Sequence, residues 1–508
     1  MKVITKNDLI AAGYLPGPRL EAMLEKLAEY RTRGITSPKY LIKLLKREFG
    51  DPVPKPTLRD SPLPWAEAIR AETREERENL TRVRRQMDQL LRTPVLIGGA
   101  IMPDACPAGT AEATLPVGGV VVAQNAILPA AHSSDIGCSM FATFYRAEGD
   151  LAVEMDALTH ATRMGQGQRA PEDWVDDPVL DEPVWENRFL YGLRERARAQ
   201  IADQGDGNHF AFLGEVEVRP EMRALLQLTG HGDLASALPI GHYRVLVTHH
   251  GSRSLGAHVY KRGLAAAVKH VARQAAGIPD AAAWLDADSE DGREYWEALQ
   301  YVSRWTRANH RAIHRRFLEA IGGIAKAEVG NAHNFVWRRG DLFYHGKGAT
   351  PAWRDDQGRP QLGLIPLNMA EPILWVLGAD HEAYHAFAPH GAGRNLSRTA
   401  LRRRYREEES RSKILAESTA GLDVRWYCGK PDLSELPFAY KDARTVREQI
   451  EAYQLAEVIA EIHPRGCLMA GDSGRSWRDR EEVLTPKQKR QIQHRKERRQ
   501  MNQEMREW

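Results

Sequence analysis

From about Pro94 onward, the sequence alternates short apolar runs with glycine-containing turns. Four of the runs read VGGVVVA, SMFATFY, HFAFLGEVEV and YRVLVT, and their length and residue types are typical of strands. The longer segment AHVYKRGLAAAVKHVARQAAG is expected to be helical. Because strands and helices follow no regular βαβ repeat, the pattern predicts one large α+β core. The absence of Rossmann and Walker glycine patterns argues against a conventional dinucleotide or P-loop site.

The composition is that of an ordinary globular protein. The chain has 508 residues, of which 42% are hydrophobic and 27% charged, and no apolar run is long enough to span a bilayer. Its first residues lack a signal-peptide pattern. Cys106, Cys138, Cys428 and Cys467 are too few and too scattered for a disulfide framework. We therefore expect a cytoplasmic protein without a membrane partner.

Additional segments flank the core. Residues 1–60 are predicted to form a small helical unit, in which Leu20, Leu27 and neighbouring apolar residues recur at helical spacing. Residues 61–81 are expected to contain a linker and the start of a charged helix that runs from about Trp65 to Leu91. Residues 471–508 form a basic tail with eight Lys/Arg against three Glu from residue 485 onward. The tail is predicted to be a helix, either solvated or in contact with a phosphate backbone.

Five polar clusters lie at the ends of the apolar runs. They are SSDIGC with Asp135 and Cys138, GNHF with Asn208 and His209, THHGSR with His249 and Arg253, AHNF with His333 and Asn334, and HGAGR with His390. One thiol, one carboxylate and several imidazoles suit a transition-metal site. Each cluster alone would also fit a hydrogen-bonded core residue. Because no CxxC pair is present, the ligands of such a site must converge from distant segments.

Basic residues beside glycines recur in three of the turns. Arg253 follows HHG, Lys347 lies in HGKGAT, and Arg394 and Arg398 lie in HGAGRNLSR. Glycine allows backbone N–H groups to approach an anion closely. A metal site beside such cations predicts phosphoryl or nucleotidyl transfer.

The motifs MPDACPAG, DIGC, GNHF, HHGSR, AHNF, HGKGAT and HGAGR occur in one order, and with them the sequence resembles the RtcB family of RNA-splicing ligases over roughly residues 82–470. The resemblance implies a catalytic core over 82–470 that joins RNA 3′-phosphate or 2′,3′-cyclic phosphate ends to 5′-hydroxyl ends, in RNA repair or tRNA splicing. Fragments of tRNA or rRNA are candidate partners, and the N-terminal unit and basic tail either pack on the core or hold RNA. Two alternatives stay open: a manganese-dependent phosphatase or phosphodiesterase on RNA ends, and a non-ligating RNA-end-binding factor.

The resemblance also implies the metal site and the nucleophile. Two Mn²⁺ ions, with zinc or iron also compatible, would be bridged by the Cys138 thiolate. Asp135 and His209 would complete one ion, and His249 and His333 the other. His390 would attack a nucleoside triphosphate and carry the nucleotide covalently. Asp104, in MPDA, matches a position near the centre and is expected to support catalysis.

A nucleotide site is implied around His390. The residues expected to bind the nucleotide are Asn208, Phe210, Phe212, Asn334, His390, Gly391, Ala392, Gly393, Arg394, Tyr440 and Met469. Contacts to phosphate or RNA are expected from Arg253, Lys347, Ser397 and Arg398.

Several positions depart from the family pattern. Phe212 and Met469 occupy places where relatives usually carry an acidic residue and a lysine that contact guanine. Leu367 and Ala370 also replace loop residues, and Gly346 replaces an arginine. A pocket without those hydrogen-bonding groups discriminates less strongly between bases. We therefore expect GTP or another nucleoside triphosphate, with ATP a serious candidate. Drift with compensating changes elsewhere, a different RNA end and an activating protein partner all stay open.

Overall fold

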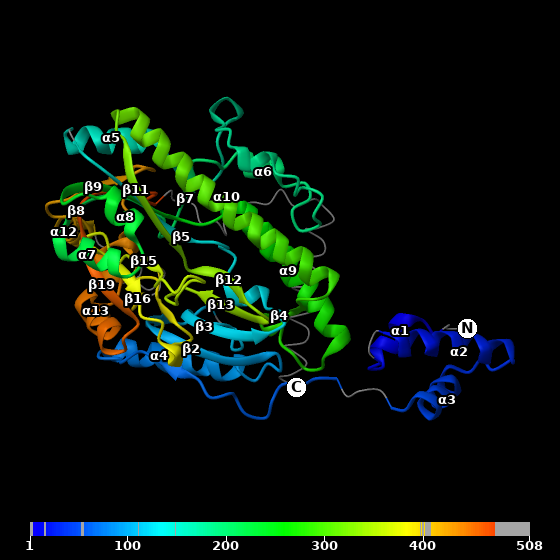
Figure 1. Cartoon of the computed structure of the whole chain (residues 1–508). Coiled ribbons are helices and arrows are strands. Elements are labelled where there is room, and N and C mark those ends of the chain that lie inside the picture. Colours follow the sequence, from blue (N-terminus) through cyan, green and yellow to red (C-terminus); the bar gives the residue numbers. More distant parts are fainter. Residues whose placement is uncertain are drawn as a thin grey trace.

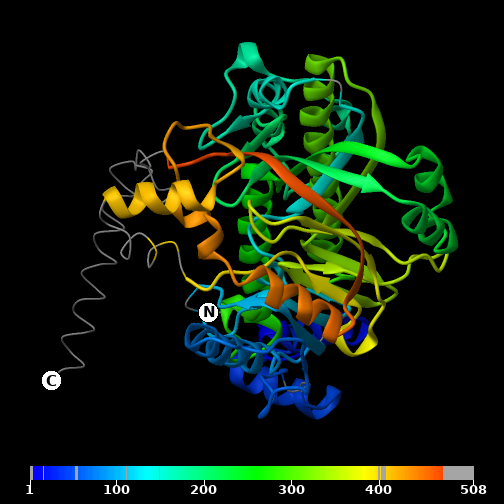
Figure 2. The same cartoon turned by 90° about the vertical axis from the view of Figure 1, so that its left-hand side faces the viewer.

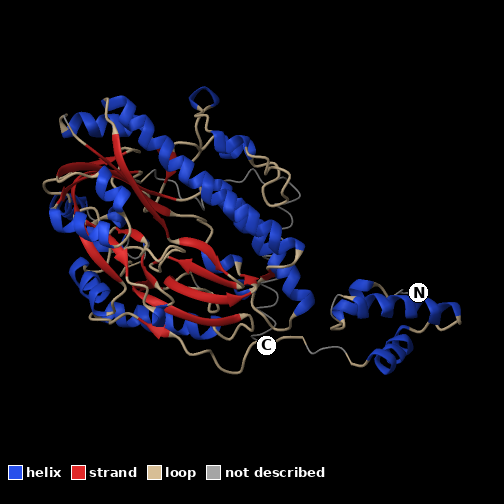
Figure 3. Ribbon diagram, in the orientation of Figure 1, coloured by secondary structure: helices blue, strands red, loops and turns tan. Residues whose placement is uncertain are grey.

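A computed structural model of the chain describes residues 4–14, 17–51, 55–109, 111–147, 149–396, 398, 401 and 408–472. Helices flank two main sheets (Figures 1 and 3), so the predicted α+β class is confirmed. The four apolar runs form β3 (Val117–Gln124), β5 (Ser139–Tyr145), β8 (Phe210–Val218) and β9 (Gly241–His250). No helix in the described part of the chain is long and apolar enough to cross a membrane.

The larger sheet has eight strands and is nearly closed. Its order is β11 (Ala325–Ala332), β5, β9, β8, β19 (Ala456–Met469), β16 (Ile373–Gly378) and β15 (Leu362–Ile365), with β18 (Asp423–Trp426) parallel to β19. The Asn331 side chain joins the two outer strands, since its Oδ1 accepts the Leu364 N–H at 2.9 Å and its Nδ2 donates to Thr350 Oγ1 at 3.1 Å. β19 spans one side of the sheet (Figure 2), pairing with β16 and then with β8. A register shift at Pro464/Gly466 fits the bend that an irregular pairing gives a strand.

The second sheet has five strands, in the order β1 (Ala66–Glu67), β2 (Leu96–Cys106), β3, β13 (Leu342–Lys347) and β12 (Asn334–Arg339). Three two-stranded pairs complete the strands: β4 (Ala126–Ile127) with β10 (Leu285–Asp286), β6 (Arg163–Met164) with β7 (Asp203–Gly205), and β14 (Ala349–Pro351) with β17 (Phe387–Pro389).

Two long helices, α9 (Arg253–Gln274) and α10 (Glu290–Ile321), lie across the sheets (Figure 1). Ser289 caps the start of α10 through the Gly292 N–H, and Gly322 ends it in the left-handed conformation, as helix ends favour. Tyr295 and Trp305 on its inner face are fully buried in the main apolar core. The other core helices are α4 (Arg74–Leu90), α5 (Leu151–Ala161), α6 (Arg194–Arg198), α7 (Pro220–Leu228), α8 (Gly232–Ala237), α12 (Glu408–Ser418) and α13 (Ala443–Ala452). The 3₁₀ helices are η1 (Pro129–His132), η2 (Pro171–Asp173), η3 (Pro178–Asp181), η4 (Asp280–Ala282), η5 (Glu382–Tyr384), η6 (Leu433–Glu435) and η7 (Pro437–Ala439).

The N-terminal unit is helical, as predicted. It consists of α1 (Lys6–Ala11), α2 (Pro18–Thr32) and α3 (Pro38–Phe49), which Figure 1 shows beyond the end of α9. Its own small core contains Leu9, Leu20, Leu27, Leu41 and Leu45.

The charged helix begins later than expected. Residues 66–67 form β1 and α4 starts at Arg74 rather than near Trp65. The reason is a capping box, in which Thr73 and Glu76 each accept the other's backbone N–H. The expected division at residue 82 therefore falls within α4. The tail beyond residue 472 lies outside the described residues, and its helix stays a prediction.

Candidate active site

Five side chains from four separate segments converge at one edge of the eight-stranded sheet. Their ligand atoms form two groups, Cys138 with His249 and His333, and Cys138 with Asp135 and His209, and within each group all atoms lie within 4.8 Å of one another. The Cys138 Sγ is 3.3 Å from His249 Nε2 and 3.7 Å from His209 Nε2. A single thiol thus belongs to both groups.

The strand pairing explains this convergence. β5 and β9 pair so that Met140 lies opposite His249, and Cys138 comes directly before β5. Its carbonyl accepts the His333 N–H at 2.9 Å, which holds the end of β11 beside it. Gly251 leaves room for Asp135, because a Cβ at that position would lie 2.1 Å from a carboxylate oxygen.

Backbone carbonyls orient two of the imidazoles. His209 Nδ1 lies 2.6 Å from the Gln204 carbonyl, and His249 Nδ1 lies 3.0 Å from that of Asn208. Since a carbonyl can only accept, each Nδ1 must carry the proton, and each Nε2 lone pair faces the thiol. Support of this kind is typical of histidines that bind metals. The buried His333 Nδ1 has no hydrogen-bond partner among the described residues.

Burial sets the protonation of these groups. It lowers the pKa of His249 to about 3 and that of His333 well below its usual value, so both rings are neutral and free to donate lone pairs. Burial opposes ionisation of Asp135, but His209 outweighs it and lowers the pKa of that carboxyl to about 2. Burial, and then Asp135, raise the pKa of the Cys138 thiol. This Cys/His/Asp donor set fits divalent transition metals, which would favour the thiolate.

His390 lies next to the ligand groups. It follows β17, and its ring centre is 4.9 Å from that of His333. The buried Asp104 places Oδ2 2.5 Å from His390 Nδ1 and 3.3 Å from the His390 backbone nitrogen. Because Nδ1 is engaged, Nε2 is the ring nitrogen left for chemistry. Gly393 (φ 74°) lets this turn approach β2, since a Cβ there would lie 2.1 Å from the Asp104 carbonyl oxygen.

A cavity of about 210 Å³ extends from His249 past His390. Its lining includes these residues of the predicted nucleotide site: Asn208, Phe210, Phe212, His390, Gly391, Ala392, Gly393, Arg394, Tyr440 and Met469, with the predicted phosphate contact Arg398. Further lining residues were not foreseen, notably Cys106, Leu367, Met369, Glu435 and Cys467. Phe212 lies opposite Cys467 on β19, and Phe210 opposite Met469. This wall of the cavity is therefore aromatic and sulfur-rich.

Glu435 supplies the carboxylate in the cavity wall. Its Oε2 accepts hydrogen bonds from Tyr440 OH at 2.6 Å and from Arg394 at 3.2 Å, and Arg398 lies 2.8 Å from Oε1. Burial opposes ionisation of Glu435, but the two arginines outweigh it and lower the pKa of that carboxyl. The sequence held no signal for Glu435, which lies in the short helix η6.

Three of the predicted contacts lie elsewhere, and a fourth is outside the described residues. Asn334 Oδ1 accepts the Gly348 N–H at 2.7 Å, which fixes the turn beside His390. Lys347 donates to the Leu115 carbonyl at 3.0 Å, and burial lowers its pKa to about 8. Ser397 is not among the described residues.

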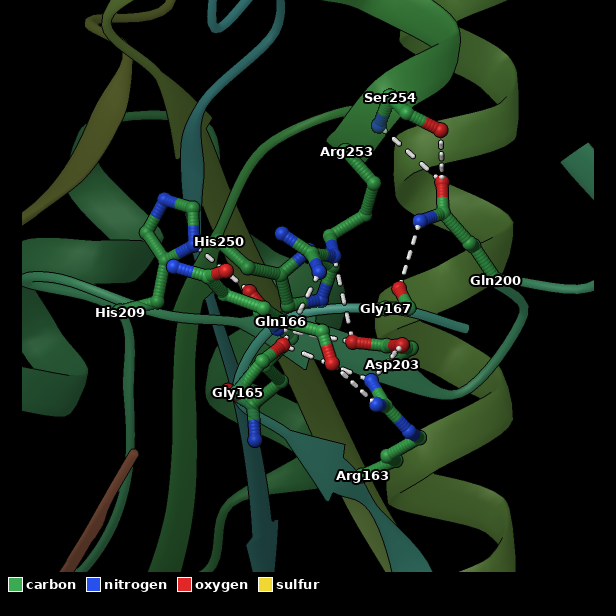
Figure 4. Close-up of polar contacts among 12 residues, drawn as sticks. Arg163, Gly165, Gln166, Gly167, Gln200, Asp203, His209, His250, Arg253 and Ser254 are labelled. Carbon is green, nitrogen blue, oxygen red and sulfur yellow. Dashed lines mark hydrogen bonds and ion pairs between the residues drawn. The ribbon is translucent and has the colours of Figure 1, made fainter. Parts of the chain in front are cut away.

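Arg253 opens α9, as expected, but it contacts a carboxylate. Its Nε is 3.2 Å from Oδ1 of the fully buried Asp203, and Arg163 binds Oδ2 of the same residue at 2.8 Å (Figure 4). The guanidinium packs against Gly205, where a Cβ would lie 1.7 Å from an Nη atom. Arg253 therefore braces the segment whose Gln204 carbonyl holds His209.

Two histidines on α10 stand behind the ligand groups. The Thr248 hydroxyl lies 2.6 Å from His310 Nδ1 and 2.8 Å from His314 Nε2. The His310 ring also stacks on that of His250, with ring centres 3.5 Å apart. These contacts tie α10 to β9 close to His249.

Comparison with known proteins decides the ancestry. The family model described as tRNA-splicing ligase RtcB matches residues 184–470, more than half of the chain. The chain belongs to the RtcB family. The RNA-splicing ligase RtcB2 of Escherichia coli is 26% identical over 359 residues, covering 69% of this chain and 83% of that protein. The Escherichia coli K12 RNA-splicing ligase RtcB is 25% identical over 382 residues, covering 69% of this chain and 86% of that protein.

An archaeal RtcB relative is comparably distant. The tRNA-splicing ligase RtcB of Thermococcus kodakarensis is 28% identical over 311 residues, and the match covers 54% of this chain and 60% of that protein. Identities of this size mark the chain as a distant member of the RtcB family.

Proposed function

We propose that this chain is an RNA ligase that joins 3′-phosphate or 2′,3′-cyclic phosphate ends to 5′-hydroxyl ends through a covalent histidine–nucleotide. One observation carries the proposal: the cavity is lined both by His249 of the shared-thiol ligand groups and by His390, whose Nδ1 contacts buried Asp104. A nucleophile and a metal-ligand set facing one space suit nucleotidyl transfer.

His390 and Asp104 divide the work of the first step. Asp104 accepts the Nδ1 proton and so leaves Nε2 as the nucleophile, which attacks the α-phosphorus of a nucleoside triphosphate while pyrophosphate leaves. An oxygen of the RNA 3′-phosphate then attacks the same phosphorus, and the P–N bond breaks. In the last step the 5′-hydroxyl oxygen attacks the activated 3′-phosphate, loses its proton, and the nucleoside monophosphate leaves.

Cys138, Asp135, His209, His249 and His333 would hold two divalent cations, with Cys138 shared. When bound, such ions withdraw charge from phosphate oxygens and orient them. Manganese is the expected ion, and zinc or iron also suits this donor set. The protein contributes fixed imidazole orientation through the Gln204 and Asn208 carbonyls.

The base end of the cavity favours a relaxed or altered choice of nucleotide. Phe212 and Met469 offer apolar surface to a base, and the Glu435 carboxylate is occupied by Tyr440 and two arginines. A wall without a free acceptor holds a purine by stacking and burial rather than by reading the guanine edge. ATP is therefore a serious candidate beside GTP.

The test is nucleotidyl transfer to the protein. Purified chain with Mn²⁺ is incubated with each α-³²P-labelled triphosphate, and the expected result is an acid-labile label that His390→Ala abolishes. His463→Ala is the matched control, because that side chain is 63% exposed and outside the cavity lining. Label retained by His390→Ala, or no label from any triphosphate in metal-loaded protein, would contradict the proposal. Hydrolysis of RNA ends that persists in His390→Ala would instead indicate a phosphatase or phosphodiesterase.

A further inference from the structure

Helix α10 carries a stripe of arginines on its outer side. Arg304, Arg307, Arg311 and Arg315 follow one another at intervals of three, four and four residues, so their side chains lie on one helix face. From first to last they span ~16 Å along the helix axis, at about 1.5 Å per residue. We call these four residues the arginine stripe.

Half of the stripe is electrically uncompensated. Arg304 pairs with Glu182 at 2.6 Å and Arg311 with Glu328 at 3.0 Å. Arg307 and Arg315 are exposed and form no ion pair or hydrogen bond with any residue that the structure describes. The stripe thus presents two unbalanced guanidinium groups, each with several donors in the fork geometry that matches a phosphate.

A cavity opens beside the stripe and leads toward the ligand groups. It measures about 230 Å³ and lies between α10 and the paired strands β5 and β11, with Arg307 and Arg311 in its lining. Its inner wall includes Phe141 and the buried His310, whose Nε2 contacts the Ser139 hydroxyl at 3.0 Å. Gly137 also lines it, and Gly137 directly precedes Cys138.

The cavity and the ligand groups therefore share one stretch of backbone. Cys138 belongs to the ligand groups, while its neighbours Gly137 and Ser139 face this second cavity. A chain that lay along α10 and entered the cavity would come within a residue's length of the proposed metal centre. Neither the arginine stripe nor this cavity belongs to the nucleotide cavity around His390.

We infer that the arginine stripe and its cavity bind the sugar–phosphate backbone of a single RNA strand. The inference rests on the proposed function and adds a binding surface to it. Uncompensated guanidinium groups in a row attract a polyanion, and a positively charged track beside an aromatic-lined recess is the arrangement that holds single strands. A duplex is too broad to enter a recess of this size, whereas one nucleotide of a single strand can insert.

The experiment compares two double variants of the full-length protein. Arg307→Gln/Arg315→Gln removes the unpaired charges of the stripe. Arg196→Gln/Arg273→Gln is the control, because it removes the same charge from exposed positions on α6 and α9 that have no ion pair within the described chain. Binding of a fluorescein-labelled single-stranded RNA oligonucleotide is measured by anisotropy over a series of salt concentrations. Thermal unfolding of each variant checks that substitution at exposed arginines leaves the fold intact.

The stripe variant should bind about tenfold more weakly at ~0.1 M salt, and its log K against log salt slope should be shallower by ~1.4, from two lost phosphate contacts on a single strand. The control should keep the wild-type slope. Equal affinity and slope in the stripe variant and the wild type, or equal losses in both variants, would overturn the inference. Wild-type protein that binds no RNA at any salt concentration would count against the proposed function itself, so the two failures are distinguishable.

Discussion

The Asp104 carboxylate is fully buried and contacts His390 twice, at Nδ1 from 2.5 Å and at the backbone nitrogen from 3.3 Å. Asp104→Asn keeps the shape of the side chain but removes the charge that fixes the Nδ1 proton. We expect nucleotide transfer to His390 to fall on the order of 10²-fold or more, since an orienting carboxylate acts through the imidazole. Single-turnover labelling measures this. Metal content should stay at the wild-type level, and an unchanged labelling rate would contradict the role of Asp104.

The sharing of Cys138 predicts how metal is lost. Cys138→Ala should remove both ions, because the thiol belongs to both ligand groups, whereas His333→Ala should remove one. Metal stoichiometry after equilibrium dialysis distinguishes the two. Cys428→Ser, at a cysteine outside both groups, should retain both ions. Two ions retained by Cys138→Ala would rule out a shared ligand.

Metal affinity should rise with pH. Burial and Asp135 raise the pKa of Cys138, so its thiol holds a proton at neutral pH that metal binding must displace. The pKa values of Asp135, about 2, and His249, about 3, lie far below this range, so these groups release no proton. The Mn²⁺ dissociation constant should therefore fall roughly tenfold per pH unit near neutrality. Titrations at several pH values would reveal a flat profile if no proton is displaced.

The base wall predicts a switch in nucleotide preference. Phe212 and Met469 lie on the paired strands β8 and β19, so Phe212→Glu/Met469→Lys would place an acceptor and a donor in the same wall. We expect the ratio of kcat/KM for GTP over ATP in His390 labelling to rise by about tenfold or more. Phe212→Leu/Met469→Leu, which keeps the wall apolar, should leave the ratio unchanged. A wild-type protein that already strongly prefers GTP would contradict the proposed role of this wall.

The closure of the large sheet depends on one amide. Asn331 bonds the Leu364 backbone and Thr350, so Asn331→Ala leaves these groups without a partner. We expect a loss of about 2 kcal/mol in the free energy of unfolding, measured by urea denaturation. Asn79→Ala, which removes one side-chain hydrogen bond to the Asn395 carbonyl, should cost less. An unchanged urea midpoint for Asn331→Ala would argue that the outer strands do not depend on this contact.

Much of the framework was visible in the sequence because strand ends and motifs coincide. β5 begins one residue after Cys138, and β9 ends with His249 and His250, so alternating apolar runs placed both near one sheet edge. The order of motifs supplied the rest. The start of α4 was misplaced although the Thr-x-x-Glu signal of Thr73 and Glu76 was present, because the tryptophan and proline-rich stretch before it drew the boundary forward.

Contacts between distant segments could not be foreseen. Arg253 looked like an anion ligand from its glycine-flanked turn, but a buried carboxylate 50 residues earlier, Asp203, occupies its guanidinium. Glu435 lies in a short 3₁₀ helix without any periodic pattern, 41 residues after Arg394. No local rule links such pairs, since their charges meet only through the tertiary fold.

The nucleophile's surroundings also constrain the order in which the protein can assemble. Asp104 meets His390, 286 residues later in the chain, and Lys441 donates to the carbonyls of Pro103 and Ala105, the former 338 residues away. A growing polypeptide on the ribosome cannot make these contacts until its last quarter has emerged, because loop closure over such separations comes late in folding. A prematurely terminated chain would therefore hold the thiol and most imidazoles yet lack an oriented histidine, which protects the cell from a half-built enzyme that captures nucleotides.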